Sequence, residues 1–160
     1  MKLEDHLVQS TFADEGQKLH MHLLVIARQL DLMLRRILKP KGLTPPQYNV
    51  LRILRGQKGQ PIAVQSLAAR MIDPSSNTSR IIDKLVDKGW ADRQVCPEDR
   101  RRADVSITPE GAAVLQGLDA PIQSMLNQSL EGLAESTRIQ LNGALAQVLN
   151  NTDDILSTQN

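Results

Sequence analysis

Three consecutive arginines, Arg100 to Arg102, follow two acids in the stretch EDRRRADVSITPEG, residues 98–111. A guanidinium group donates hydrogen bonds in a planar fork that matches phosphate and carboxylate groups. A cluster of three could therefore bind a polyanion, although a charge run of this kind is also typical of a solvated turn. The elements on either side of the run decide between these two interpretations.

The composition limits the kinds of function that the chain can carry. With 160 residues it is long enough for one hydrophobic core, and its 2% aromatic content disfavours sites built from stacked rings. The net charge of +1 means that affinity for a polyanion must come from a local patch. A single cysteine, Cys96, excludes an intramolecular disulfide and fits a reducing compartment. Without a signal peptide or a run of ~20 apolar residues, a cytoplasmic protein without a membrane partner is expected.

Residues that could perform catalysis are scarce. The sequence contains no glycine-rich phosphate loop, no nucleophile elbow and no histidine, cysteine or carboxylate cluster at ligand spacing. His20 and His22 lie ~200° apart around a helix and cannot chelate one metal ion together. We therefore expect no enzyme activity, no catalytic residue, no metal site and no cofactor.

Helix start and stop signals are clear in the amino-terminal half. A long helix is predicted over 14–38, with apolar residues at helical spacing, and it ends before Pro40 and Gly42. Thr44 then begins a second helix, with a proline at its first position and Gln47 at capping-box spacing; Gly56 is expected just past its end. An extended pair of residues near 62 and a helix over 64–72 follow.

The next helix is predicted over 73–89, capped by Asp73 and ended by Gly89. Its apolar stripe contains Thr78 and the aliphatic residues at 81, 82 and 85. At 100° per residue the opposite face is rich in hydrogen-bonding groups. Its members are Ser76, Arg80, Asp83, Lys84 and Asp87, with Asn77 and Ser79 at the margins.

Two short strands, 90–95 and 103–107, are predicted from their period-two alternation, and the charged loop between them should project from the body. Thr108 and Pro109 begin another long helix, which Pro121 could kink, and an amphipathic helix closes the chain. The fold class is thus mainly α with a small β-wing: a winged helix-turn-helix over 44–108 flanked by long helices over 14–38 and 109–156. We treat 1–160 as one domain.

This architecture gives the arginine cluster a chemical task. A helix of about 10–12 Å diameter fits the major groove of DNA, where each base pair presents its own pattern of donors and acceptors. A projecting basic loop can reach the neighbouring minor groove, whose negative potential attracts arginine. The combination favours binding of double-stranded DNA.

The stretches LTPPQYNVLRIL, SSNTSRIIDKLVDKGWADR and PEDRRRADVSITPEG, with the long flanking helices, resemble the MarR family of bacterial transcriptional regulators. The resemblance covers nearly the whole chain, in order. Its most specific element is the wing, with Asp-Arg-Arg after one strand, then a strand ending in Ile-Thr, then Gly at the next helix start.

The resemblance implies roles for particular residues. In the recognition helix Ser76, Asn77, Ser79, Arg80 and Lys84 match positions that face DNA. In the wing, Arg100 and Arg101 match an arginine pair of which one enters the minor groove, and Asp99 would shape the wing by holding the other. Arg102 and Arg93 are expected beside phosphates, although Arg93 and Lys88 could equally be solvated surface charges. The acids Asp83 and Asp87 near this face could narrow the DNA footprint.

The long terminal helices expose apolar stripes that a compact winged domain cannot cover alone, which points to a partner. In the family this partner is a second copy, so we expect a homodimer that binds an inverted repeat with half-sites ~34 Å apart. Completion of a monomeric core is the alternative. Family members often respond to small anionic or lipophilic effectors; no effector-binding residue can be named from the sequence.

The expected function is therefore that of a homodimeric transcriptional regulator, a repressor released by a small effector. Two alternatives stay open. The low net charge and the acids on the recognition helix are compatible with a winged-helix protein-interaction module that does not bind DNA. Cys96, beside the wing arginines, could make the regulator redox-responsive, although the neighbouring acids oppose a lowered thiol pKa.

Overall fold

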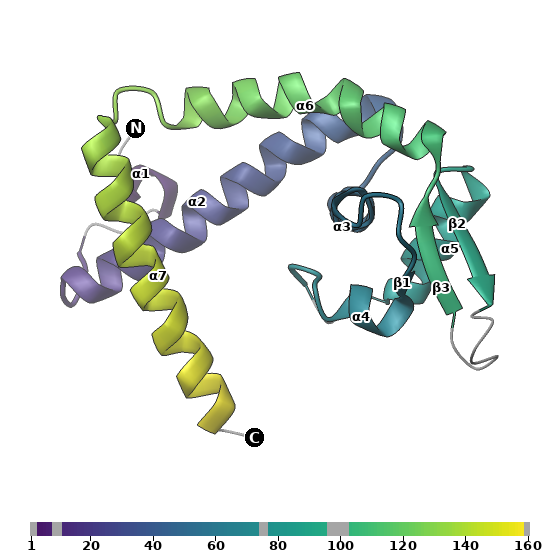
Figure 1. Cartoon of the computed structure of the whole chain (residues 1–160). Coiled ribbons are helices and arrows are strands. Elements are labelled where there is room, and N and C mark those ends of the chain that lie inside the picture. The colour runs from purple at the N-terminus through teal and green to yellow at the C-terminus, as the bar shows by residue number, and fades with distance from the viewer. Residues whose placement is uncertain (1–2, 8–10, 74–76, 96–102, 159–160) are drawn as a thin grey trace. The chain divides into compact units, whose positions relative to one another are not determined.

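The computed structural model describes residues 3–7, 11–73, 77–95 and 103–158. Contacts between residues divide the chain into two compact units, Met1–Gln123 and Ser124–Asn160. The first unit contains the helix-turn-helix elements and a small sheet, and the second contains the last long helix (Figure 1).

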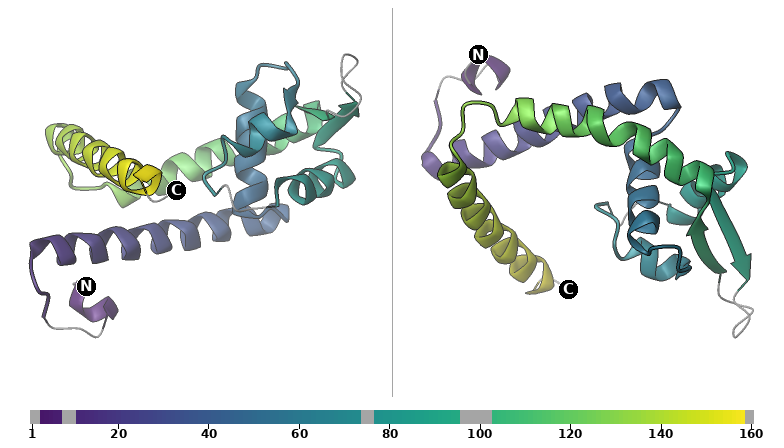
Figure 2. Two further views of the ribbon diagram at one scale, coloured as in Figure 1. Left: turned by 90° about the horizontal axis from the view of Figure 1, so that it is seen from below. Right: turned by 45° about the horizontal axis from the view of Figure 1, so that its top comes forward.

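The first long helix, α2, spans Glu15–Leu38, as predicted. It begins at this point because the Asp14 carboxylate accepts a hydrogen bond from the Gln17 backbone N–H at 2.7 Å. A short helix, α1 (Leu3–Leu7), precedes it and was not predicted from the sequence. The amino-terminal part of α2 extends away from the helix-turn-helix elements (Figure 2).

Helix α3 spans Pro45–Gly56 and follows a one-turn 3-10 helix, η1 (Lys39–Lys41). The predicted capping box at its start is present: Thr44 Oγ1 accepts from the Gln47 N–H at 3.5 Å, and Gln47 Oε1 accepts from the Thr44 N–H at 3.1 Å. Gly56 was expected beyond the helix but is its last residue. The chain reverses afterwards at Lys58 and Gly59, which both have positive φ.

The two helices of the helix-turn-helix are shorter than predicted. Helix α4 spans Val64–Ala68 and α5 spans Thr78–Asp87, so the expected start of α5 at Asp73 is wrong. Asn77 is the actual cap, because its Oδ1 accepts from the Arg80 N–H at 3.1 Å. The predicted stripe is buried at Thr78, Ile82 and Leu85, whereas Ile81, which was also expected in it, is only half-buried.

The strands form an antiparallel sheet in the order β1-β3-β2, with β1 at Ile62–Ala63, β2 at Ala91–Val95 and β3 at Ala103–Ile107. The two predicted wing strands are correct, and the extended pair near residue 62 adds a third strand to them. Val105 in the central strand lies opposite both Ile62 and Arg93 and is fully buried. In the first unit the helices and the sheet share one core, whose largest fully buried side chains are Leu38, Val50, Leu51, Leu54, Leu67, Ile82, Leu85, Val105 and Leu115.

The start of helix α6 (Pro109–Ser129) is tied to the end of α5. Thr108 Oγ1 donates to the Gly89 carbonyl at 2.7 Å and accepts from the Gly111 N–H at 3.1 Å. A Cβ atom at Gly111 would lie 2.1 Å from the Trp90 carbonyl oxygen, so no larger residue fits without a backbone shift. The helix continues through Pro121.

Helix α6 is also linked to α3 by an ion pair. The Arg55 guanidinium makes three hydrogen bonds of 2.9–3.0 Å to the two carboxylate oxygens of Asp119. These bonds raise the pKa of Arg55 above its ordinary value, against the opposing effect of partial burial. This bidentate pair joins α3 to α6.

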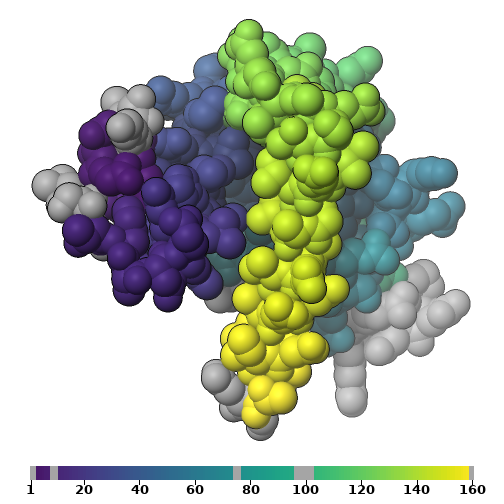
Figure 3. All heavy atoms as spheres, turned by 90° about the vertical axis from the view of Figure 1, so that its left-hand side faces the viewer, coloured from purple at the N-terminus to yellow at the C-terminus, as the bar shows by residue number. Residues whose placement is uncertain are grey.

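The second unit contains helix α7, which spans Glu135–Thr158 and is coloured towards yellow in Figure 3. Near the start of this helix the Arg138 guanidinium donates to the carbonyls of Leu130 and Leu133, in the connection from α6, at 3.0 Å each. None of its described residues is buried, and its exposed large apolar side chains are Ile139, Leu141, Leu145, Leu149, Ile155 and Leu156. Among the described residues no helix is long and apolar enough to span a membrane.

Candidate nucleic-acid interface

Helix α5 presents a polar face outward, as its sequence pattern predicts. Arg80, Asp83, Lys84 and Asp87 are exposed, whereas Ser79 is half-buried. The apolar residues on the other side anchor the helix in the core, so the position of these polar groups is fixed by packing. This face carries two cations and two acids, and its charge therefore depends on how the acids are paired.

Asn77 has a structural task that the sequence prediction did not include. Its side-chain oxygen caps α5 by accepting the Arg80 N–H. That hydrogen bond fixes the first turn of the helix, from which the Arg80 side chain projects. Within the described residues no acceptor is hydrogen-bonded to the amide nitrogen of Asn77, which could donate to an external acceptor.

Arg93 of strand β2 reaches across to α5. Its Nη1 lies 2.6 Å from Asp83 Oδ1 and 3.4 Å from Ser79 Oγ. Arg93 is therefore not a freely solvated charge, and the charge of Asp83 is neutralised within the protein. This pairing reduces the repulsion of phosphate that was expected from Asp83.

Lys88 is likewise held within the fold. Its ammonium group donates to the Gly42 carbonyl at 2.5 Å and lies 4.7 Å from the centroid of the Trp90 ring. The first contact joins the end of α5 to the turn before α3, and the second is within the range of a cation–π interaction. Lys88 thus connects the helix-turn-helix to the start of β2.

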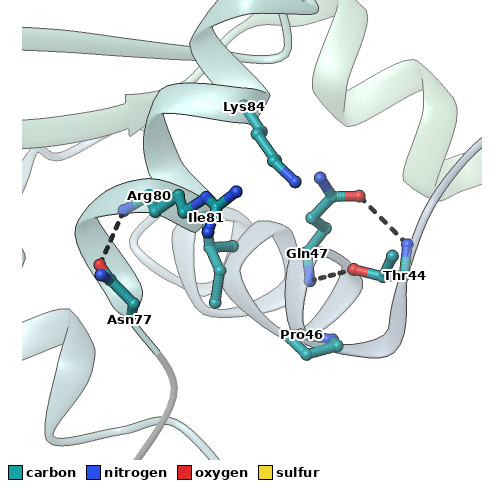
Figure 4. A pocket seen from close by; sticks show the side chains of 7 residues that line it. All are labelled: Thr44, Pro46, Gln47, Asn77, Arg80, Ile81 and Lys84. Carbon is teal, nitrogen blue, oxygen red and sulfur yellow. Dashed lines mark hydrogen bonds between the residues drawn. The ribbon is translucent and has the colours of Figure 1, made fainter.

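A hollow of about 340 Å³ lies between the start of α3 and the exposed face of α5 (Figure 4). Arg80 and Lys84 reach it from α5, and the capping-box pair lies opposite them. Its lining residues are Thr44, Pro46, Gln47, Asn77, Arg80, Ile81 and Lys84. Two cations beside the amino-terminal end of a helix create a positive potential that favours anions.

Part of the site that the sequence predicts, including the wing arginines, falls on residues that the structure does not describe. Ser76, Asp99, Arg100, Arg101 and Arg102 lie outside the described residues, as does Cys96. The pairing of Val95 with Ala103 brings the two ends of segment 96–102 together at the end of the β2–β3 ladder. The wing is therefore supported by a paired strand on each side.

The histidines that could have suggested a metal site have local partners. His20 Nδ1 lies 3.0 Å from the Gly16 carbonyl, and His22 Nδ1 lies 3.1 Å from the Lys18 carbonyl; both contacts are within α2. Over the part of the chain that the structure describes, no three histidine, cysteine or acidic residues are grouped to hold a metal ion.

Sequence reasoning missed two features of this surface. The capping box was recognised, but Thr44, Pro46 and Gln47 were not expected to line a hollow beside Arg80. The pairing of Asp83 with Arg93 was also missed, because it depends on how β2 packs against α5. An arginine on the first strand of the wing, ten residues after an acid on the recognition helix, is the one sequence signal that could have suggested it.

Comparisons with known proteins agree with this architecture. The MarR family profile matches residues 43–103. A mutant MarR from Escherichia coli, solved in complex with operator DNA, superposes with a TM-score of 0.73 and 26% identity over 88% of this chain and 99% of that one. Residues 43–103 of this chain thus carry a MarR-family domain.

Two curated proteins also match this chain, each over more than two thirds of its own length. The transcriptional repressor MprA of Escherichia coli K12 is 25% identical over 120 residues, which are 75% of this chain and 68% of MprA. The multiple antibiotic resistance protein MarR of the same strain is 29% identical over 116 residues, which are 72% of this chain and 76% of MarR. The MarR-family proteins to which this chain is similar are transcriptional regulators, not enzymes.

Proposed function

We propose that this MarR-family protein is a homodimeric repressor that binds an inverted-repeat operator and is released by a small effector. The observation that carries the proposal is the exposed, capped face of α5, on which Arg80 and Lys84 project from a helix anchored in the core. In the related structure, a MarR of the same fold is in complex with operator DNA.

In this proposal α5 enters the major groove and the wing reaches the adjacent minor groove. Ser76, Asn77, Ser79, Arg80 and Lys84 face the DNA from the recognition helix. The DNA phosphates and the minor groove are contacted by four arginines, Arg93, Arg100, Arg101 and Arg102. Asp99 shapes the wing. Residues 44–108 thus form the DNA-binding lobe of one MarR-type domain.

The dimer part of the proposal rests on exposed apolar surface. Helix α2 exposes Leu19, Leu24, Ile26 and Leu32, and α7 exposes the six large apolar residues named above. Soluble monomers rarely leave so much apolar area open to water, and a second copy of the chain would cover it. We assign residues 14–38 and 109–156 to this interface.

The repressor part is supported by the printed name of MprA, a transcriptional repressor. Release by an effector is supported by the hollow between α3 and α5. A small anion bound there would occupy Arg80 and Lys84, the same cations that DNA needs. Anion and operator would then compete, and repression would end as the anion accumulates.

Salt dependence of DNA affinity tests the proposal against the alternative of a protein-interaction module. Phosphate contacts release counterions, so the logarithm of the DNA association constant should fall linearly and steeply with the logarithm of salt concentration. The measurement is a titration of labelled duplex by fluorescence anisotropy at several salt concentrations. A folded protein that binds no duplex even at low salt would favour the interaction module.

A further inference from the structure

We propose that Asp83 is a positioning residue for DNA binding. It holds the Arg93 guanidinium beside the recognition helix, where the remaining N–H donors of Arg93 can bind a phosphate of the DNA backbone. The inference rests on the proposed function, since it needs DNA at the α5 face. Its basis is the 2.6 Å contact between Arg93 Nη1 and Asp83 Oδ1.

The geometry leaves a usable part of the guanidinium unoccupied. An arginine side chain carries five N–H donors. Nη1 is directed at Asp83 Oδ1 and, at 3.4 Å, at Ser79 Oγ. Within the described part of the chain, no acceptor is hydrogen-bonded to Nη2 or Nε of Arg93. These two nitrogens form the edge of the fork that pairs with phosphate.

The location of the pair agrees with such a role. It joins α5 to β2, the strand that leads directly to the wing, so it lies where the recognition helix and the wing meet. The two side chains keep 35% and 55% of their surface exposed, and a ligand at this surface can therefore reach them. Exposed ion pairs contribute little to folding stability, so a purely structural role explains the pair poorly.

Positioning has a direct effect on affinity. A long side chain that becomes ordered on binding loses conformational entropy, which weakens the complex. Because Asp83 already restricts the Arg93 side chain, DNA has less ordering to impose on it. Removing the carboxylate should therefore weaken DNA binding, although it also removes a negative charge from the DNA face.

The opposite signs of these two effects make the inference testable. Coulomb repulsion alone predicts that Asp83→Asn binds DNA more tightly. Positioning predicts that Asp83→Asn binds roughly three- to ten-fold more weakly, the range expected when one rotamer-rich side chain must be ordered on binding. Asp87→Asn is the matched control, because Asp87 is an exposed acid one helical turn further on and has no ion pair within the described residues. Because Asp87 lies on the same face but holds none of the described arginines, Asp87→Asn should bind DNA more tightly than the wild type.

The experiment is a double-mutant cycle with Arg93→Ala, measured by fluorescence anisotropy on a duplex that the wild-type protein enriches from a random-sequence library. Thermal unfolding of each variant sets a temperature at which all are folded. If Asp83 acts through Arg93, the loss of affinity caused by Asp83→Asn disappears in the Arg93→Ala background, where neutralising the carboxylate leaves DNA affinity unchanged or raises it. Rescue by Asp83→Glu is expected in part, since a carboxylate is restored.

Two results would overturn the inference alone: Asp83→Asn binding at least as tightly as the wild type, or the same loss of affinity with and without Arg93. Both leave DNA binding by the wild type intact, and so leave the proposed function standing. A folded wild-type protein that enriches no duplex would instead overturn the proposed function, and this inference with it.

Discussion

Arg80 lies in the first turn of α5, and the hydrogen bond from its own backbone N–H to Asn77 fixes the start of that helix. Its side chain is exposed and borders the hollow that α3 completes. An arginine in this position can bind guanine through two hydrogen bonds or bind a phosphate oxygen. The two roles differ in whether they distinguish one base sequence from another.

Replacing Arg80 by alanine should weaken operator binding by about 1–3 kcal/mol if the side chain contacts a base, because a bidentate contact is lost. The preference at that base position should also relax. Competition titrations against operators with single base-pair changes measure both effects.

Lys39→Ala is the control, since Lys39 is an exposed cation of η1, outside the residues assigned to the DNA-binding lobe and to the dimer interface. It should leave affinity and base preference unchanged. An equal loss for Arg80→Ala at every base sequence would assign Arg80 to phosphate. No loss at all would remove it from the interface.

At the residue scale, periodicity predicted which side chains α5 exposes, because one buried stripe at 3.6 residues per turn determines the opposite face. It could not predict that Asp83 is paired with Arg93 or that Lys88 reaches the Gly42 carbonyl. Both contacts join elements whose relative placement depends on tertiary packing. The wing arginines were singled out from the sequence, and their roles stay predictions.

At the scale of elements, the start of α6 is fixed both by a side-chain cap and by a close contact between two backbone segments. Thr108 bridges the Gly89 carbonyl and the Gly111 N–H, while Gly111 lies against the Trp90 carbonyl. The glycine in the TPEG motif is thus required by the approach of two backbone segments. Its place in the wing motif has a steric reason.

Gly111→Ala should destabilise the protein by about 1–3 kcal/mol, since the new methyl group would overlap the Trp90 carbonyl oxygen. Urea unfolding followed by circular dichroism measures the change. Gly117→Ala in the same helix has no atom within 4 Å of the added Cβ and should stabilise the protein by up to about 1 kcal/mol. Equal effects of the two substitutions would contradict the steric explanation.

At the element scale, the sequence predicted helix starts well where one cap was available, at Asp14, Thr44 and Thr108. It failed for α5, where both Asp73 and Asn77 could cap and only the three-dimensional turn selects between them. The short helix α1 was missed because five residues give too little periodicity to recognise.

For the whole molecule, the proposed dimer depends on apolar residues that a single chain leaves in water. Leu141, Leu145 and Leu149 follow one another at intervals of four along α7, so they share a face of the helix. The sequence predicted this stripe, but it could not predict which surface covers it. That information belongs to the partner.

Leu145→Glu should weaken dimerisation by about 3 kcal/mol, roughly a hundred-fold, because an unpaired carboxylate would be buried in the interface. Sedimentation equilibrium over a range of protein concentrations measures this change. Gln147→Glu adds the same charge about 160° away from Leu145 around α7 and should leave the dimer intact. Dimers of equal affinity for both variants would exclude this face of α7 from the interface.

The most direct test of the central claim is selection of genomic DNA fragments by the purified protein at physiological salt, with the Arg100→Ala/Arg101→Ala double variant in parallel. We expect the wild type to enrich fragments that share an inverted repeat with half-sites about 34 Å apart. The double variant, folded and dimeric, should lose this enrichment. Absence of any shared repeat from a folded, dimeric wild-type protein would contradict the account of this chain as an operator-binding regulator.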